Sequence, residues 1–251
     1  MNILRIIKEL YTGKDNLVAQ ITIFALVGIM AIAFNEVISL FTGNTLYAVF
    51  SVPSYAEVII FSMLGIMIFI FFTGYIYKFV HENYTSEIAF LPSISMNCFT
   101  TFIKVFPVMF VWGIYFGIAG LLGTTFLKAD RIEFYIYWAF LMILLPFINI
   151  IFVKFVKNYT YNAEIFNPIY VVKIIRKVFI KVILYLLQFI LLGFVISVLS
   201  SLCFKFGVTG QTRVVELIII LTTLCISSYL QQVLNLAYYR GLTEIIKKNG
   251  V

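Results

Sequence analysis

Charged residues are scarce in this chain: Asp, Glu, Lys and Arg make up 12% of its 251 residues, whereas hydrophobic residues make up 63%. A water-soluble domain of this length cannot bury so much apolar surface in one core. The scarcity of charge therefore excludes an ordinary soluble domain. It favours an all-α helical bundle embedded in lipid, with residues 1–251 forming a single transmembrane domain.

Residues that commonly carry chemistry are also few. The chain has one histidine, His81, and three cysteines, Cys98, Cys203 and Cys225, with no C-x-x-C spacing. This argues against a histidine-based triad, a zinc site or a redox pair within the chain. The signatures G-x-x-x-x-G-K-[ST], H-E-x-x-H and G-x-S-x-G are missing as well. We therefore predict no enzymatic activity, no metal and no other cofactor.

Long apolar runs are what the sequence does have. A helix needs roughly 20 residues to cross the ~30 Å hydrocarbon layer of a bilayer, and runs of that length favour helices over core strands. The predicted spans are Val18–Leu40, Ala56–Val80, Phe102–Thr125, Phe134–Val156, Phe179–Leu202 and Val214–Ala237.

The basic residues are distributed unevenly about these spans. When both termini are placed on one side, only four of the 18 Lys and Arg residues fall on the other side. They are Lys128, Arg131, Lys205 and Arg213. Because positively charged loops stay in the cytoplasm, we predict a multi-pass protein of the cell membrane with cytoplasmic termini. The net charge of +7 then needs no nucleic-acid partner, which would require a soluble basic surface.

The first residues predict an amphipathic helix ahead of the first span. Arg5, Lys8 and Glu9 follow helical spacing and apolar residues cover the rest, as in helices that lie in the headgroup layer. The basic start, the apolar run and Ala31-Ile32-Ala33 also resemble a secretory signal with its cleavage site. Because the apolar run continues to Phe41, we prefer a membrane span.

A stretch of the sequence occurs twice, about 76 residues apart. The first copy has Lys-Phe-Val at 78–80, Asn-Tyr-Thr at 83–85 and a proline at 92, and the second has the same elements at 154–156, 158–160 and 168. The repeat predicts three units of one amphipathic helix and two spans each, over residues 1–80, 81–156 and 157–240. They would be parallel repeats about an axis along the membrane normal.

Each copy of the repeat leads into an amphipathic segment. In the second copy, four cations recur on one helical face: Lys173, Arg176, Lys177 and Lys181. Lys104 closes the polar stripe of the corresponding segment after Pro92. Such a face either anchors the protein to anionic lipid or docks a cytoplasmic partner such as an ATPase.

Polar residues within the predicted spans are the candidate site for a translocated solute or another ligand. They are Asn149, Gln231, Gln232 and Asn235. Polar groups that face lipid are costly, and Pro146 can break the helix ahead of Asn149 and open a cavity. The alternative interpretation is that these side chains only form hydrogen bonds between helices.

Gly113, Gly117 and Gly120 lie on one face of the third span. Small residues at this spacing let two helices approach closely. We therefore predict a packing face here, either within the bundle or against another subunit.

Gly74-Tyr75, the basic helix end that follows, Pro92 and the Phe-rich segment after it resemble a group of prokaryotic polytopic integral membrane proteins of unknown function. The resemblance covers about residues 15–200. The second copy of the repeat departs from it, with Ile150-Ile151 in the region of Gly-Tyr. The resemblance implies a six-helix fold and brings no activity or site residues with it.

Two kinds of function fit these features. The first is a transport subunit, the permease component of an ABC-type exporter. It would need a separate ATPase and a second membrane subunit, identical or related. The second is a non-transporting membrane scaffold, regulator or immunity protein against a membrane-active peptide, which the low polar content of the spans favours. We place transport first.

Overall fold

The computed structural model describes residues 2–12, 16–42, 55–127, 131–208 and 213–250, and it contains helices but no strand in these ranges. The helices are α1 (Ile3–Thr12), α2 (Asn16–Thr42), α3 (Tyr55–Asn83), α4 (Asn97–Phe126), α5 (Ile132–Asn158), α6 (Ala163–Phe166), α7 (Pro168–Val208) and α8 (Arg213–Asn249). Six of them are long and apolar enough to cross a membrane. The all-α prediction with six spans is confirmed, and the fold is that of a multi-pass membrane protein.

The observed helices contain the predicted spans, but two of them are much longer. α7 has 41 residues and α8 has 37, which is about 60 Å and 55 Å at a rise of ~1.5 Å per residue, against a hydrocarbon layer of ~30 Å. The amphipathic segments expected after Pro92 and Pro168 are not separate helices. α4 and α7 run through these segments into the following spans without a break.

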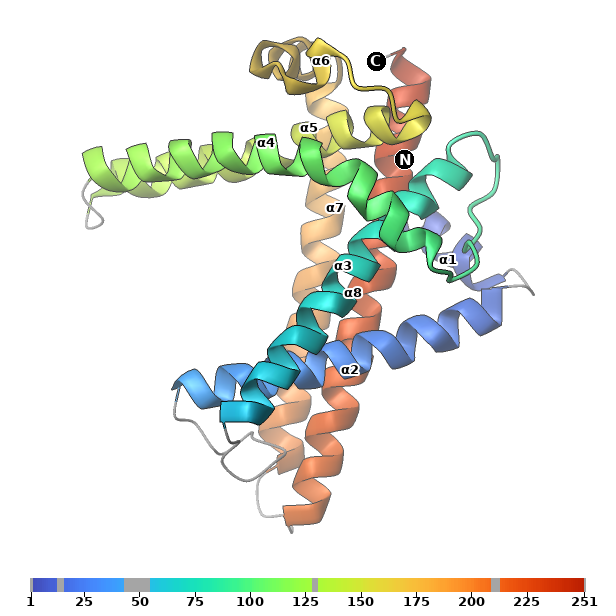
Figure 1. Cartoon of the computed structure of the whole chain (residues 1–251), viewed down its shortest axis with the longest axis vertical. Coiled ribbons are helices and arrows are strands. Elements are labelled where there is room, and N and C mark those ends of the chain that lie inside the picture. Colours follow the sequence, from blue (N-terminus) through green and yellow to red (C-terminus); the bar gives the residue numbers. More distant parts are fainter. Residues whose placement is uncertain (1, 13–15, 43–54, 128–130, 209–212, 251) are drawn as a thin grey trace.

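The helical hairpins point in different directions (Figure 1). α7 and α8 form a long antiparallel pair, vertical in the view, and the α4–α5 hairpin projects transversely from the end of the pair where both chain termini lie. α2 crosses the pair nearer its other end. The six apolar helices therefore do not share a single direction.

The best-packed part of the molecule lies where α3, α5 and α8 end and α7 begins. Phe79, Phe155 and Leu242 are at most 1% exposed there. In contrast, the outer halves of the spans expose apolar side chains such as Ile118 and Leu191. These surfaces match lipid tails, which are as apolar as leucine.

α1 is the amphipathic helix that the sequence predicts, but protein covers its apolar face. Ile3, Ile6 and Leu10 are at most 2% exposed, because α1 packs against α8, α2 and α7. On its polar face, Arg5 pairs with Glu244 of α8 at 2.7 Å. The covered face is therefore not available to the headgroup layer.

Candidate functional site

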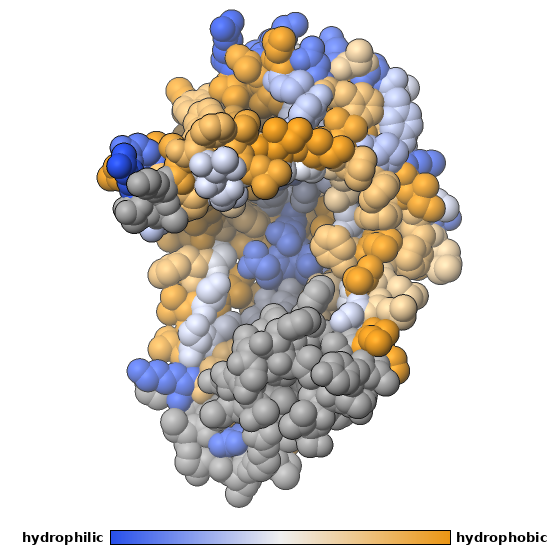
Figure 2. Space-filling view, turned by 60° about the vertical axis from the view of Figure 1, so that its left-hand side comes forward, coloured by the Kyte–Doolittle hydropathy of each residue, from blue (hydrophilic) through white to orange (hydrophobic). Residues whose placement is uncertain are grey.

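A polar cavity of about 430 Å³ lies between α2, α7 and α8. Val27 and Met30 of α2 form an apolar wall. The polar side chains that line the cavity are uncharged: Ser197, Ser200, Ser227, Ser228, Gln231 and Gln232. Figure 2 shows a hollow in one face of the molecule with hydrophilic side chains at its floor.

The cavity lies among residues of the membrane spans. Val27, Ser197 and Gln231 all belong to helices that are long and apolar enough to span a membrane. Polar groups within such helices are stable only where they meet water, a ligand or each other. The cavity is therefore a place where the bundle can hold water or a polar solute.

The chemistry of the lining is that of neutral hydrogen-bonding groups. The hydroxyl of Ser197 donates to the carbonyl of Gly193 at 2.9 Å, and that of Ser200 donates to the carbonyl of Ile196 at 2.8 Å. Both oxygens keep acceptor capacity after these bonds, and the glutamine amides offer donors as well as acceptors. The cavity suits an uncharged molecule that both donates and accepts hydrogen bonds.

The predicted set of polar residues is only partly brought together. Gln231 and Gln232 line the cavity, and the amide of Asn235 donates to Gln232 Oε1 at 3.4 Å. Asn149 lies elsewhere, in α5, where its Oδ1 accepts from the hydroxyl of Tyr239 at 3.4 Å. Asn149 thus joins two helices, as the alternative interpretation expected.

The serines of the cavity were missing from the sequence prediction. Serine in a spanning helix usually bonds to its own helix backbone, so it gives little sign of a site. The available signal was that serines occur three apart in one apolar run, Ser197 and Ser200, and side by side in the next, Ser227 and Ser228.

The basic residues predicted to form one surface are divided. Lys173, Arg176 and Lys177 line a second cavity together with Lys154 and Tyr170. Lys181 is not among its lining residues. Its ammonium donates to the side chain of Asn249 at 2.5 Å, which ties α7 to the end of α8.

Lys104 belongs to neither group. Its ammonium lies 5.0 Å from the ring centroid of Tyr159, in the loop after α5. Burial raises the pKa of Tyr159 to about 12, so the ring is neutral at physiological pH and acts as a cation–π partner. The hydroxyl of Tyr161 donates to the Lys104 carbonyl. Lys104 therefore connects α4 to this loop.

Only one end of the predicted glycine face, at Gly120, lies close to another helix. A Cβ on Gly120 would lie 3.3 Å from Trp138 of α5, whereas Gly113 and Gly117 face open space. Among the described glycines, the tightest site is Gly74 of α3, where a Cβ would lie 1.9 Å from the carbonyl oxygen of Cys98 in α4. Packing of Gly113 and Gly117 against another subunit stays a prediction.

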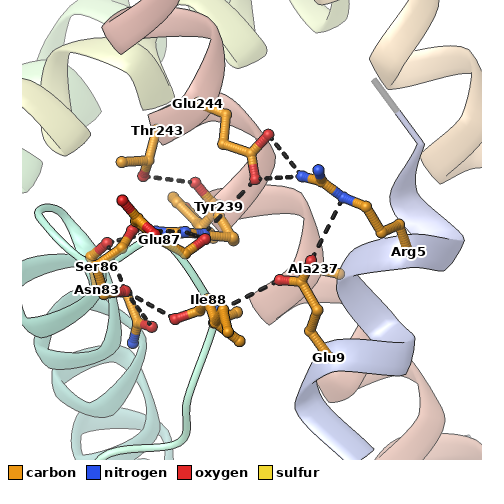
Figure 3. Close-up of polar contacts among 12 residues, drawn as sticks. Arg5, Glu9, Asn83, Ser86, Glu87, Ile88, Ala237, Tyr239, Thr243 and Glu244 are labelled. Atoms are coloured by element: carbon orange, nitrogen blue, oxygen red, sulfur yellow. Dashed lines mark hydrogen bonds and ion pairs between the residues drawn. The ribbon is translucent and has the colours of Figure 1, made fainter.

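A buried arginine of α8, Arg240, holds the loop that follows α3. Figure 3 shows Asn83, Ser86 and Glu87 close to Tyr239 and Glu244 of α8. Arg240 is 2% exposed. Its guanidinium donates to the carbonyls of Asn83, Ser86 and Glu87, the last two at 2.9 Å and 3.0 Å. The bond to Asn83 satisfies a carbonyl that the end of α3 leaves without a helical partner, and the other two bonds hold carbonyls of the loop.

Two carboxylates extend this network to α1. Glu244 accepts from Arg5 at 2.7 Å and lies 3.8 Å from Nε of Arg240. Glu9 accepts the backbone N–H of Ala89 at 3.2 Å. We call the network of Arg240, Glu244, Arg5, Glu9 and the loop 83–89 the Arg240 clamp. It joins α1, α3 and α8 at the well-packed end of the molecule.

Comparison of the chain with models of known protein families, with curated protein sequences and with solved structures gave no match. The resemblance to polytopic membrane proteins of unknown function therefore stays an expectation. Within the described ranges, no three His, Cys, Asp or Glu side chains come together as a metal-binding set.

Proposed function

We propose that this protein is the membrane subunit of a transport complex and that the polar cavity receives the transported solute. The cavity itself is the observation that carries the proposal. Its volume of about 430 Å³ is within the ~300–1,000 Å³ of small-molecule sites. Its uncharged lining favours a neutral polar solute or the neutral polar part of a larger molecule.

The arrangement of the walls supports a change of access. α2 forms one wall and the α7–α8 pair forms the other, so a movement of α2 against the pair would open or close the cavity. The sequence has no nucleotide-binding motif, and we therefore propose an ABC-type exporter in which a separate ATPase supplies the energy. A second membrane subunit, identical or related, would complete the pathway.

Purification of the native protein in mild detergent tests the proposal. We expect a stoichiometric ATPase to remain bound. The variant with Gln231→Leu and Gln232→Leu should keep the ATPase bound and change the rate of ATP hydrolysis, because it alters the cavity and leaves the cytoplasmic end intact. Isolation of the protein alone, or only with copies of itself, would contradict the ABC assignment.

A membrane scaffold, regulator or immunity protein is the second candidate. The open face at Gly113 and Gly117 on the projecting α4–α5 hairpin favours it, because another membrane helix could pack closely there. Apolar replacements of Gln231 and Gln232, which line the cavity, separate the two candidates. A scaffold would keep its function in this variant, whereas a transport subunit would lose it at unchanged expression.

A further inference from the structure

A second cavity, near the start of α7, has a different chemistry. It has a volume of about 360 Å³ and is lined by four cations, Lys154 of α5 and Lys173, Arg176 and Lys177 of α7, together with Tyr170, Ile174 and Gly250. We call it the basic cavity. Its volume is again within the range of small-ligand sites.

No carboxylate balances these cations in the part of the chain that the structure describes. The ion pairs within 4.0 Å involve Arg5, Lys78 and Arg240. Like charges around one cavity repel each other, most strongly where water is partly excluded. An anion in the basic cavity would remove this cost.

Lys154 is the innermost of the four cations and is held by Tyr170. Its ammonium bonds to the Tyr170 hydroxyl and lies 4.8 Å from the centroid of the same ring. An ammonium has three donors, so this contact leaves others for a ligand. Lys154 is half-buried, whereas Lys173, Arg176 and Lys177 are exposed. The cavity thus reaches from the protein surface to a positioned charge inside.

The surroundings of the cavity are those of a membrane surface. The same part of α7 exposes Ile169, Val172 and Ile180, by 66%, 47% and 71%. Exposed apolar side chains beside a group of cations match the boundary between lipid tails and anionic headgroups.

We propose that the basic cavity binds the phosphate of an anionic phospholipid. The guanidinium of Arg176 can contact two phosphate oxygens at once, and the lysines add charge without fixed geometry. This site is separate from the polar cavity between α2, α7 and α8, and it stands whether or not the protein transports a solute.

Native mass spectrometry of the full chain in detergent, titrated with phosphatidylglycerol or phosphatidylcholine, tests the proposal. We expect a saturable one-to-one complex with phosphatidylglycerol only. The triple variant K173Q/R176Q/K177Q should weaken it on the order of 100-fold. The control K8Q/K104Q/K248Q removes the same charge from the same side of the chain outside the cavity, and it should retain the complex.

Each alternative has its own outcome. If lipid binding were weakened equally in both variants, it would depend on the overall surface charge and not on the basic cavity. This result would overturn the proposal. Displacement of the lipid by inorganic phosphate of equal affinity would assign the cavity to free phosphate instead. If K173Q/R176Q/K177Q bound the lipid as well as the wild type but lost a co-purifying ATPase, the surface would be a docking face for a protein. If the triple variant fails to elute like the wild type on size exclusion, the single variant R176Q applies the same test, with an expected weakening of about 5-fold.

Discussion

The two copies of the repeated sequence share a motif but not an environment. Each copy ends a helix at the Asn of Asn-Tyr-Thr, α3 at Asn83 and α5 at Asn158. Asn83 is 1% exposed, and its amide exchanges two hydrogen bonds with the backbone of Phe90, both at 2.8 Å. Asn158 is exposed. In addition, the guanidinium of Arg240 donates to the Asn83 carbonyl in the first copy. A repeated sequence therefore predicts a repeated helix end and not its surroundings.

The lysine of each copy has a similar role in both. Lys78 donates to the carbonyl of Ser93 at 2.6 Å, and Lys154 bonds to the hydroxyl of Tyr170. Each lysine thus ties the end of its helix to the chain just beyond the following proline. This contact depends on residues within the copy, whereas the Arg240 clamp depends on a distant helix. The division into three units remains a prediction.

The largest expected effect comes from breaking the Arg240 clamp. Arg240→Met removes the donors of three loop carbonyls and leaves Glu244 without this cation, which should cost about 3–5 kcal/mol of unfolding free energy. Thermal unfolding in detergent measures the loss. Proteolysis should then cut the loop 84–96 faster and leave cutting of the segment 159–167, which contains α6, unchanged. Equal cutting of both loops would contradict a clamp that serves one copy.

Gly74→Ala should have the next largest effect. The added Cβ would meet the backbone of Cys98, which cannot rotate away, so α3 and α4 must separate at a cost of about 3 kcal/mol. The second copy has Ile150 at the matching position, buried at 0% exposure. Gly113→Ala is the control. It adds a methyl group in open space and should leave the melting temperature unchanged or slightly raised. Similar losses in both variants would contradict the close approach.

A matched pair of alanine variants gives the smallest expected difference. Asn83→Ala leaves the N–H and carbonyl of Phe90 without partners and should cost about 2 kcal/mol. Asn158→Ala changes an exposed side chain and should stay within about 0.5 kcal/mol of wild type. Unfolding of both variants in the same detergent provides the comparison. A larger loss for Asn158→Ala would reverse the roles assigned to the two copies.

The helices could be predicted from the sequence because apolar run length decides whether a segment spans a bilayer. The directions of the helices could not. Hydropathy does not determine which helix crosses which. Nothing in the sequence therefore indicated that the α4–α5 hairpin lies across the direction of α7 and α8. The length of α7 was also underestimated, since the basic face after Pro168 suggested a separate helix. Helical periodicity in fact continues from this face into the span.

The candidate site shows the same limit. Gln231 and Gln232 were found because amides stand out within an apolar run. Asn149 stood out equally but bonds to Tyr239 in another helix, and only the fold separates these cases. Arg240 was not among the predicted site residues. Its burial depends on a loop that is far away in the sequence and close in the structure.

The most direct test of the transport proposal is the access of water to the polar cavity. Ser228→Cys and Phe194→Cys would be placed in a chain whose Cys98, Cys203 and Cys225 are replaced by alanine. A charged, membrane-impermeant thiol reagent is then applied to membrane vesicles of both orientations, because the thiolate that reacts forms only in contact with water. We expect Ser228→Cys to react. Phe194→Cys should not react, because Phe194 is 64% exposed on a span and is therefore covered by lipid. If neither cysteine reacted, water would not reach the polar cavity, and this result would contradict the proposal.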